Sequence, residues 1–237
     1  MLTAMTVSLV SRLTDLVSPR ACAICGCRVE LAGHVICAAC NMLLPRTSFA
    51  SNPYDNVMAK SFWGIIPLEK AVAMMRYEHG SQACNIVYGM KYESHPDFCY
   101  EMGRLMAMEL QATDFFADID LLLPVPLARK RQAERGYNQS EEMARGIADV
   151  TGLPVVTGVV RRTIFKGSQT SLSRWERQDN MEGAWELADG RKVAGKHVAI
   201  VDDVVTTGAT VVACATQLLK AANVRISVVS LGYAGKG

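Results

Sequence analysis

The hydrophobic positions of this chain follow two different spacings. Short apolar runs typical of buried strands occupy residues 71–77, 119–127, 155–160, 197–203 and 224–232. Apolar residues recur every three or four positions, the spacing of a helix, over 81–91, over 97–112, from about 138 onward, and over 208–222. Strands that alternate with helices predict an α/β fold, in which helices flank both faces of a parallel twisted sheet.

Two further segments precede this pattern. An apolar stripe predicts an amphipathic helix over residues 1–19, ending at Pro19 and formed by Leu2, Met5, Leu9, Leu13 and Leu16. Cysteines crowd into residues 20–44, and Pro, Ser and Asn are frequent over 45–60, which is typical of a linker. We therefore expect the α/β domain over residues 61–237.

The composition excludes several classes of protein. The chain has 237 residues, half of them apolar, and a net charge of +2, so it can bury a core and is neither disordered nor a coiled coil. Its longest charge-free stretches, 1–11 and 204–219, are shorter than the roughly 18 residues of a membrane span. The first residues carry no basic leader, so we expect a cytoplasmic protein.

Four of the eight cysteines form two CxxC pairs, and these predict a zinc site. Cys22 and Cys25 are separated from Cys37 and Cys40 by 11 residues. Two such turns can complete a tetrahedral shell of four thiolates, which leaves no open position for catalysis, so the expected role of the zinc is structural. Cys27 or His34 could replace one of these ligands. Buried or redox-active thiols and an iron–sulfur cluster are the alternatives.

Residues 198–210 (VAIVDDVVTTGAT) combine a buried strand, two acids and the start of a helix. Asp202 and Asp203 fall at the carboxyl end of the strand, where open α/β sheets bind ligands. The small residues that follow can cradle a phosphate at the helix N-terminus. The pattern suits a ribose 5-phosphate. The alternative is an ordinary turn in which Thr206 or Thr207 caps the helix.

This segment resembles the phosphoribosyl diphosphate (PRPP) binding motif of type I phosphoribosyltransferases. Together with residues 123–140 (LPVPLARKRQAERGYNQS), residues 162–185 and the CxxC pairs, it makes the chain similar to the ComF family of competence-associated proteins. The resemblance implies a type I phosphoribosyltransferase sheet, with a hood at about 61–116, a PRPP-binding core at about 117–237, and Mg²⁺ bound together with PRPP.

The resemblance also implies roles for single residues. Residues 125–178 include ten basic side chains and only five acidic ones. Lys130, Arg131 and Arg135 would bind the diphosphate. Gln169 and Arg174 would approach PRPP from a loop at 162–180 that closes over it. The sugar and phosphate contacts would come from Asp202, Asp203, Thr206, Thr207, Gly208, Ala209 and Thr210, and the catalytic set would be Asp202, Asp203, Arg131 and Arg135.

The function implied is that of a PRPP-binding protein in natural competence and DNA uptake, with an acceptor that the sequence does not identify. A hood over the sugar could be formed by Trp63, Tyr77, Lys91, Tyr92 and Tyr100. Basic residues also interleave with Tyr137, Phe165, Trp175 and Trp185, a composition that single-strand grooves share. The alternatives are therefore an accessory protein that binds single-stranded DNA and other DNA-uptake proteins, and a PRPP-sensing regulator.

Overall fold

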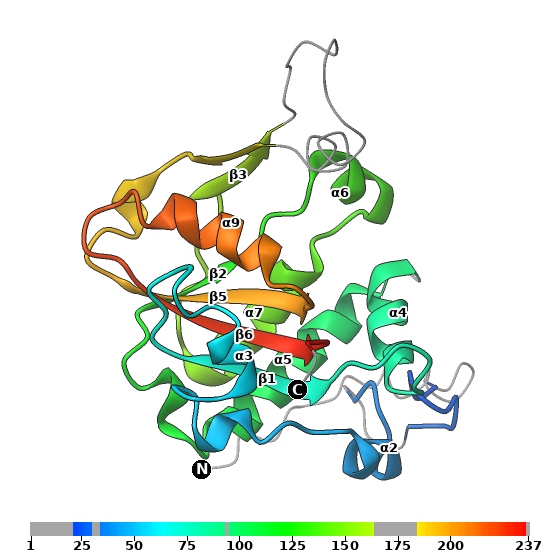
Figure 1. Cartoon of the computed structure of the whole chain (residues 1–237). Coiled ribbons are helices and arrows are strands. Elements are labelled where there is room, and N and C mark those ends of the chain that lie inside the picture. The colour runs from blue at the N-terminus through cyan, green and yellow to red at the C-terminus, as the bar shows by residue number, and fades with distance from the viewer. Residues whose placement is uncertain (1–20, 30–33, 93–94, 164–183, 236–237) are drawn as a thin grey trace, which may run out of the picture.

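A four-stranded parallel sheet forms the centre of the molecule (Figure 1). The computed structural model describes residues 21–29, 34–92, 95–163 and 184–235. In spatial order the strands are β1 (Ala71–Arg76), β6 (Arg225–Tyr233), β5 (His197–Val205) and β2 (Leu121–Pro124). Every neighbouring pair is parallel, which confirms the predicted α/β fold.

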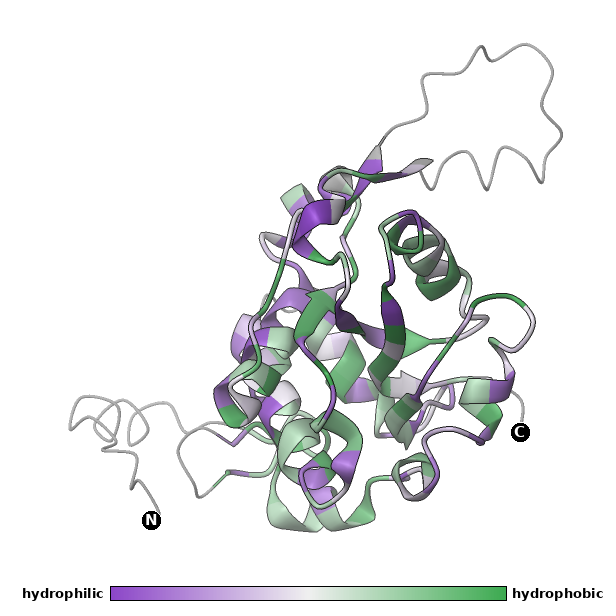
Figure 2. Ribbon diagram, turned by 90° about the vertical axis from the view of Figure 1, so that its left-hand side faces the viewer, coloured by the Kyte–Doolittle hydropathy of each residue, from purple (hydrophilic) through white to green (hydrophobic). Residues whose placement is uncertain are grey.

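Helices cover both faces of this sheet because its strands are apolar on both sides. On β5, Val198 and Ile200 pack into a cluster with α3 (Val57–Lys60) and α9 (Ala209–Leu218). Ala199 and Val201, which alternate with them, join a second cluster with α4 (Cys84–Tyr92), α5 (Pro96–Leu110) and α7 (Gln139–Thr151). Figure 2 shows the hydrophobic strands at the centre, between the helices.

Helices α5 and α7 cross at unusually close range. A Cβ atom placed on Gly103 would lie 2.1 Å from the carbonyl oxygen of Met143, and one on Gly146 would lie 1.9 Å from that of Tyr100. Both neighbours are backbone atoms, which cannot turn aside as a side chain can. The crossing therefore requires glycine at both positions.

The predicted strand at 155–160 is wrong. Only Val155 joins the sheet, through a single parallel bridge to Leu122, after which Val160 starts a separate hairpin. The hairpin consists of β3 (Val160–Thr163) and β4 (Ala184–Leu187). Pairing stops because the next donor on β2 would be Pro124, which has no N–H group.

The segments before the sheet pack onto it. Residues 45–60, for which the sequence indicates a linker, hold η1 (Phe49–Ser51) and α3, and bury Phe49 and Met58. The cysteine segment includes α2 (Ala38–Leu43), and Cys22, Ile36 and Cys40 belong to the core shared with α4, α5 and α7. Residues 1–19, the expected amphipathic helix, lie outside the described residues.

Three short helices complete the part of the chain that the structure describes. They are η2 (Asp114–Phe116), α6 (Arg129–Arg135) and η3 (Gly190–Lys192). None of the described helices is long and apolar enough to cross a bilayer. The expected hood region contributes directly to the main sheet, since β1 is hydrogen-bonded to β6.

Candidate functional site

A cavity of about 900 Å³ lies at the carboxyl ends of the central strands. Ligands of open α/β sheets bind at this edge. Of the residues expected to bind PRPP, those that line the cavity are Arg131, Arg135, Asp202, Asp203, Thr206 and Thr210. The fold thus brings acidic, hydroxyl and guanidinium groups from two segments, 131–135 and 202–210, into one space.

Asp202 is the more buried of the two acids, with 8% of its surface exposed. It lies within β5, because the strand runs on to Val205 rather than ending before the acids. Its Oδ1 atom accepts hydrogen bonds from Ser140 Oγ at 3.4 Å and from the backbone N–H of Asp203 at 2.9 Å. Burial, followed by the neighbouring charge of Asp203, raises the pKa of the Asp202 carboxyl to about 7.

Asp203 points toward a cation. Its Oδ2 atom lies 3.0 Å from Lys91 Nζ, and its Oδ1 atom accepts the backbone N–H of Val204 at 2.7 Å. Lys91 stands on the last turn of α4, so the ion pair links that helix to β5. The charge of Asp203 is therefore balanced from across the cavity.

The turn between β5 and α9 brings backbone N–H groups and hydroxyls to the cavity edge. Its N-cap residue is Gly208 at φ 77°, and a Cβ there would lie 2.7 Å from the Phe62 ring, so glycine is required. Neither Thr206 nor Thr207 is the N-cap residue, although Thr207 Oγ1 accepts the N–H of Ala209 at 3.4 Å. N–H groups at such a helix start can donate hydrogen bonds to an anion.

The predicted basic loop is a short helix, α6 (Arg129–Arg135). Its sequence RKRQAER consists mostly of good helix formers, but it lacks the apolar stripe that would have predicted a helix. Arg131 and Arg135 are four residues apart and therefore share a face, and both line the cavity. Lys130 belongs to the same helix.

Three polar residues at the start of α7 support the site, although the motif at 123–140 that contains them assigned them no role. The Asn138 side chain accepts the N–H of Ser140 and donates to the Val125 carbonyl, each at about 3 Å. Gln139 Nε2 donates to the carbonyl of Met90 at 3.3 Å, and Ser140 reaches Asp202. A polar triplet directly after the basic segment was the available signal.

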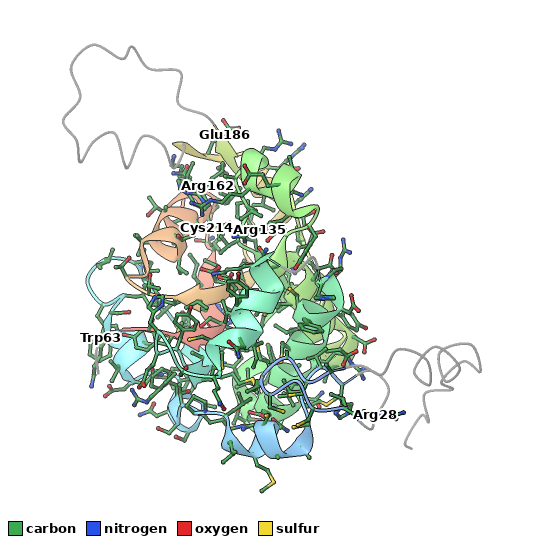
Figure 3. All side chains as sticks on the ribbon, turned by 90° about the vertical axis from the view of Figure 1, so that its right-hand side faces the viewer. Arg28, Trp63, Arg135, Arg162, Glu186 and Cys214 are labelled. Atoms are coloured by element: carbon green, nitrogen blue, oxygen red, sulfur yellow. The ribbon has the colours of Figure 1, made fainter. Side chains whose placement is uncertain are left out.

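Only some of the expected hood residues line the cavity. Tyr77 and Lys91 line the cavity, but Trp63 and Tyr100 do not. Trp63 is exposed and lies well away from Arg135 and Arg162 (Figure 3). The cavity wall also contains Arg162 from the basic segment, and five residues that no sequence motif indicated, namely His79, Ser81, Cys84, Asn85 and Tyr88.

Part of the predicted site cannot be placed. Gln169 and Arg174, together with Phe165 and Trp175, lie outside the described residues. Trp185 is described, and the guanidinium carbon of Arg162 lies 5.0 Å from the centre of its ring. This cation–π contact joins β3 to β4 beside the cavity.

The four CxxC cysteines form a second cluster, far along the chain from the acids. The sulfur atoms of Cys22, Cys25, Cys37 and Cys40 all lie within 4.8 Å of one another, and those of Cys25 and Cys37 are 3.8 Å apart. Cys27 is exposed and lies outside the cluster. The arrangement could hold a tetrahedral metal ion such as zinc.

Backbone donors support thiolates in this cluster. The Sγ atom of Cys22 accepts N–H groups from Ile24 at 3.5 Å and Cys37 at 3.3 Å, while that of Cys37 accepts from Cys40 at 3.4 Å. Burial opposes ionisation of Cys22, but the backbone N–H groups of Cys25, Cys37 and Ile24 outweigh it and lower the pKa of the Cys22 thiol to about 6. A metal would find at least one ligand ready to deprotonate.

Residues 105–236 match the family described as the phosphoribosyl transferase domain. The match spans β2, β5, β6 and the acidic pair. A DNA utilization protein from Shigella flexneri is 27% identical over 206 residues, which cover 82% of this chain and 89% of that protein. Competence protein F from Haemophilus influenzae is 35% identical over 92 residues, which cover 38% of this chain and 40% of that protein.

Two solved structures show weaker similarity. The allosteric regulatory enzyme of purine biosynthesis aligns with a TM-score of 0.39 and 23% identity, over 59% of this chain and 29% of that one. The glutamine PRPP amidotransferase from B. subtilis aligns with a TM-score of 0.37 and 22% identity, over 55% and 25%. This chain thus matches less than a third of the length of either structure.

Proposed function

Because this chain belongs to the phosphoribosyl transferase domain family and to its ComF group, we propose that it binds PRPP with Mg²⁺ in the cavity at the end of β5 and acts in DNA uptake. One observation carries the proposal. Asp202, Asp203 and the turn at 206–210 share a single cavity with Arg131 and Arg135. Each group matches one part of PRPP.

The match follows the chemistry of the ligand. Carboxylates of Asp202 and Asp203 accept hydrogen bonds from ribose hydroxyls, and the turn at 206–210 offers N–H groups and threonine hydroxyls to the 5′-phosphate. Guanidinium groups of Arg131 and Arg135 bind diphosphate oxygens. Asp202 and Asp203 would hold Mg²⁺ beside the diphosphate, where the ion would neutralise negative charge.

If the protein transfers the ribosyl group, the bond from ribose C1 to the diphosphate breaks and an acceptor takes its place. Arg131 and Arg135 would stabilise the departing pyrophosphate. The decisive assay for turnover incubates the protein with PRPP, Mg²⁺ and a panel of bases and amines, and measures pyrophosphate release. If PRPP binds but no pyrophosphate is released with any of the acceptors, a PRPP-sensing regulator is favoured.

The binding proposal is tested with Asp203→Asn. Titration calorimetry with PRPP and Mg²⁺ should show affinity reduced by about tenfold or more, because the variant loses an anionic acceptor. Asp55→Asn is the matched control, since Asp55 pairs with Lys60 at 2.7 Å and does not line the cavity. Equal affinity for wild type and Asp203→Asn would contradict the assignment.

A second candidate function is binding of single-stranded DNA. The observation that favours it is Arg162 stacked on Trp185 at the edge of a cavity that Arg131 and Arg135 also line. Bases stack on aromatic rings, and cationic side chains follow the backbone phosphates. The related DNA utilization and competence proteins are consistent with this candidate.

The DNA candidate is tested by competition. Replacing Lys130, Arg131 and Arg135 with Ala should weaken oligonucleotide binding and flatten its salt dependence, by about 0.7 in the log–log slope for each lost phosphate contact. PRPP should displace DNA from the wild type. Full DNA affinity at saturating PRPP would place any DNA surface elsewhere, and undetectable DNA binding at low salt would remove this candidate.

A further inference from the structure

The backbone at Lys91 belongs to a turn of helix α4 that is fixed by hydrogen bonds. The carbonyl oxygen of Met90, the preceding residue, accepts hydrogen bonds from Tyr137 Oη and from Gln139 Nε2. Tyr137 lies between α6 and α7 and Gln139 is the first residue of α7, so this end of α4 is tied to the start of α7. The Lys91 side chain is 26% exposed and can still move its ammonium group within the cavity.

The partner of Lys91 is a carboxylate that needs a counter-charge. Asp203 is only 15% exposed in its side chain, and its neighbour Asp202 is more deeply buried. Two adjacent carboxylates held away from water repel one another unless a cation compensates them. Lys91 Nζ, 3.0 Å from Asp203 Oδ2, supplies such a charge.

We propose that Lys91 is an internal counter-cation. Its ammonium group pairs with Asp203 until a metal–diphosphate ligand binds, and then pairs with the diphosphate instead. The proposal rests on the proposed function and adds a control over what the site accepts. A carboxylate already paired with an ammonium group is a poor ligand for a lone divalent cation. The metal therefore enters together with the polyanion, which offers Lys91 a new partner.

The chemistry of lysine allows Lys91 to exchange Asp203 for the diphosphate. Lysine carries a compact charge on a flexible four-carbon stem, so its ammonium can move between acceptors without moving the helix. Arg131 and Arg135 line the same cavity, so an anion that enters beside them also comes near Lys91. Neither step requires any covalent chemistry.

The test uses Mn²⁺ as a probe, because free Mn²⁺ is counted directly by electron paramagnetic resonance. Without PRPP, Lys91→Met should bind Mn²⁺ about tenfold more tightly than wild type, since Asp203 has lost its paired charge. The same variant should bind PRPP with Mg²⁺ about tenfold more weakly in calorimetry, since one diphosphate contact is gone. Lys91→Arg, which keeps the charge, should stay near wild type for Mn²⁺.

The opposite signs separate this role from others. If Lys91 only maintained the fold, its replacement would lower the affinity for both Mn²⁺ and PRPP. If it only bound the diphosphate, its replacement would leave the Mn²⁺ affinity unchanged. Either result would overturn the proposal. Lys60→Met is the matched control, because it removes a lysine–aspartate pair outside the cavity and should change neither affinity.

Two further comparisons keep the outcome unambiguous. Should Lys91→Met fail to fold, Lys91→Gln makes the same change of charge and is measured in its place. If wild type binds no PRPP but loss of Lys91 still raises Mn²⁺ affinity, the proposed function fails while Lys91 remains the counter-cation of the acids. If PRPP binds and Mn²⁺ affinity does not rise, only the counter-cation role fails.

Discussion

Lys70 shows how single buried polar residues are satisfied at the end of the sheet opposite the cavity. It is 4% exposed, and its Nζ atom donates to the Phe115 carbonyl and to Asp118. Asp118 also lies against His197, whose ring nitrogens contact the Asp118 carbonyl at 2.9 Å and Ser227 Oγ at 2.8 Å. These contacts tie the amino ends of β5 and β6 to the segments that precede β1 and β2.

A pH-dependent contribution to stability follows from this cluster. Partial burial opposes ionisation of Asp118, but the Lys70 ammonium outweighs it and lowers the pKa of the carboxyl. A lowered pKa stabilises the fold above the unfolded value of about 3.9, and the effect is lost as pH falls through the folded value.

We predict that Asp118→Asn reduces the free energy of unfolding by about 2 kcal/mol at neutral pH, less than for a fully buried pair because Asp118 is 43% exposed. Urea unfolding across pH provides the measurement, and the difference from wild type should shrink as pH falls through the folded pKa of Asp118. Asp55→Asn, an exposed carboxyl, should cost less at any pH. A deficit that persists in acid would indicate a packing role instead.

At the scale of elements, the crossing of α5 and α7 sets where the site can form. Helix α7 carries Ser140 at its start, and its packing on α5 fixes its distance from β5. The sequence predicted both helices from their apolar spacing. It did not predict the crossing, because the glycines there lie far apart in the chain.

We predict that Gly146→Ala destabilises the protein by about 3 kcal/mol or more, because the added methyl group meets backbone that cannot yield without separating the helices. Thermal unfolding measures the effect. Met108→Ala, on the exposed side of α5, should change stability by less than about 1 kcal/mol. A fully stable Gly146→Ala variant would mean that the helices separate at little cost.

At the scale of the whole molecule, the cysteine segment is joined to the α/β core rather than lying apart from it. Cys22, Ile36 and Cys40 pack in the cluster that contains Met102 and Met106 of α5. The segment is nevertheless too short to hold a core of its own. We propose that one structural zinc ion, bound by the four CxxC cysteines, keeps it folded.

We predict that the purified protein contains one zinc per chain, and that Cys22→Ser combined with Cys40→Ser abolishes it. Elemental analysis provides the measurement, with Cys27→Ser as the control that retains the metal. Removal of zinc by a chelator should expose the amides of residues 21–29 and 34–44 to hydrogen exchange before those of the sheet. Zinc that survives the double substitution would refute the ligand assignment.

Local patterns in the sequence determined much of this protein. The apolar runs predicted the four strands of the main sheet, and the CxxC spacing predicted a cysteine cluster that the structure brings together. The motif around Asp202 and Asp203 indicated the family that the comparisons support. Such features are readable because hydrophobic spacing and turn chemistry act within about a dozen residues.

Only the tertiary structure decided which distant residues meet. The pairing of Lys91 with Asp203, and the approach of Ser140 to Asp202, join segments that no local pattern connects. The bridge at Val155 stops because of Pro124 on another strand. These contacts depend on how strands order themselves in a sheet and how helices cross, and both are set by packing of the whole chain rather than by the spacing of neighbouring residues.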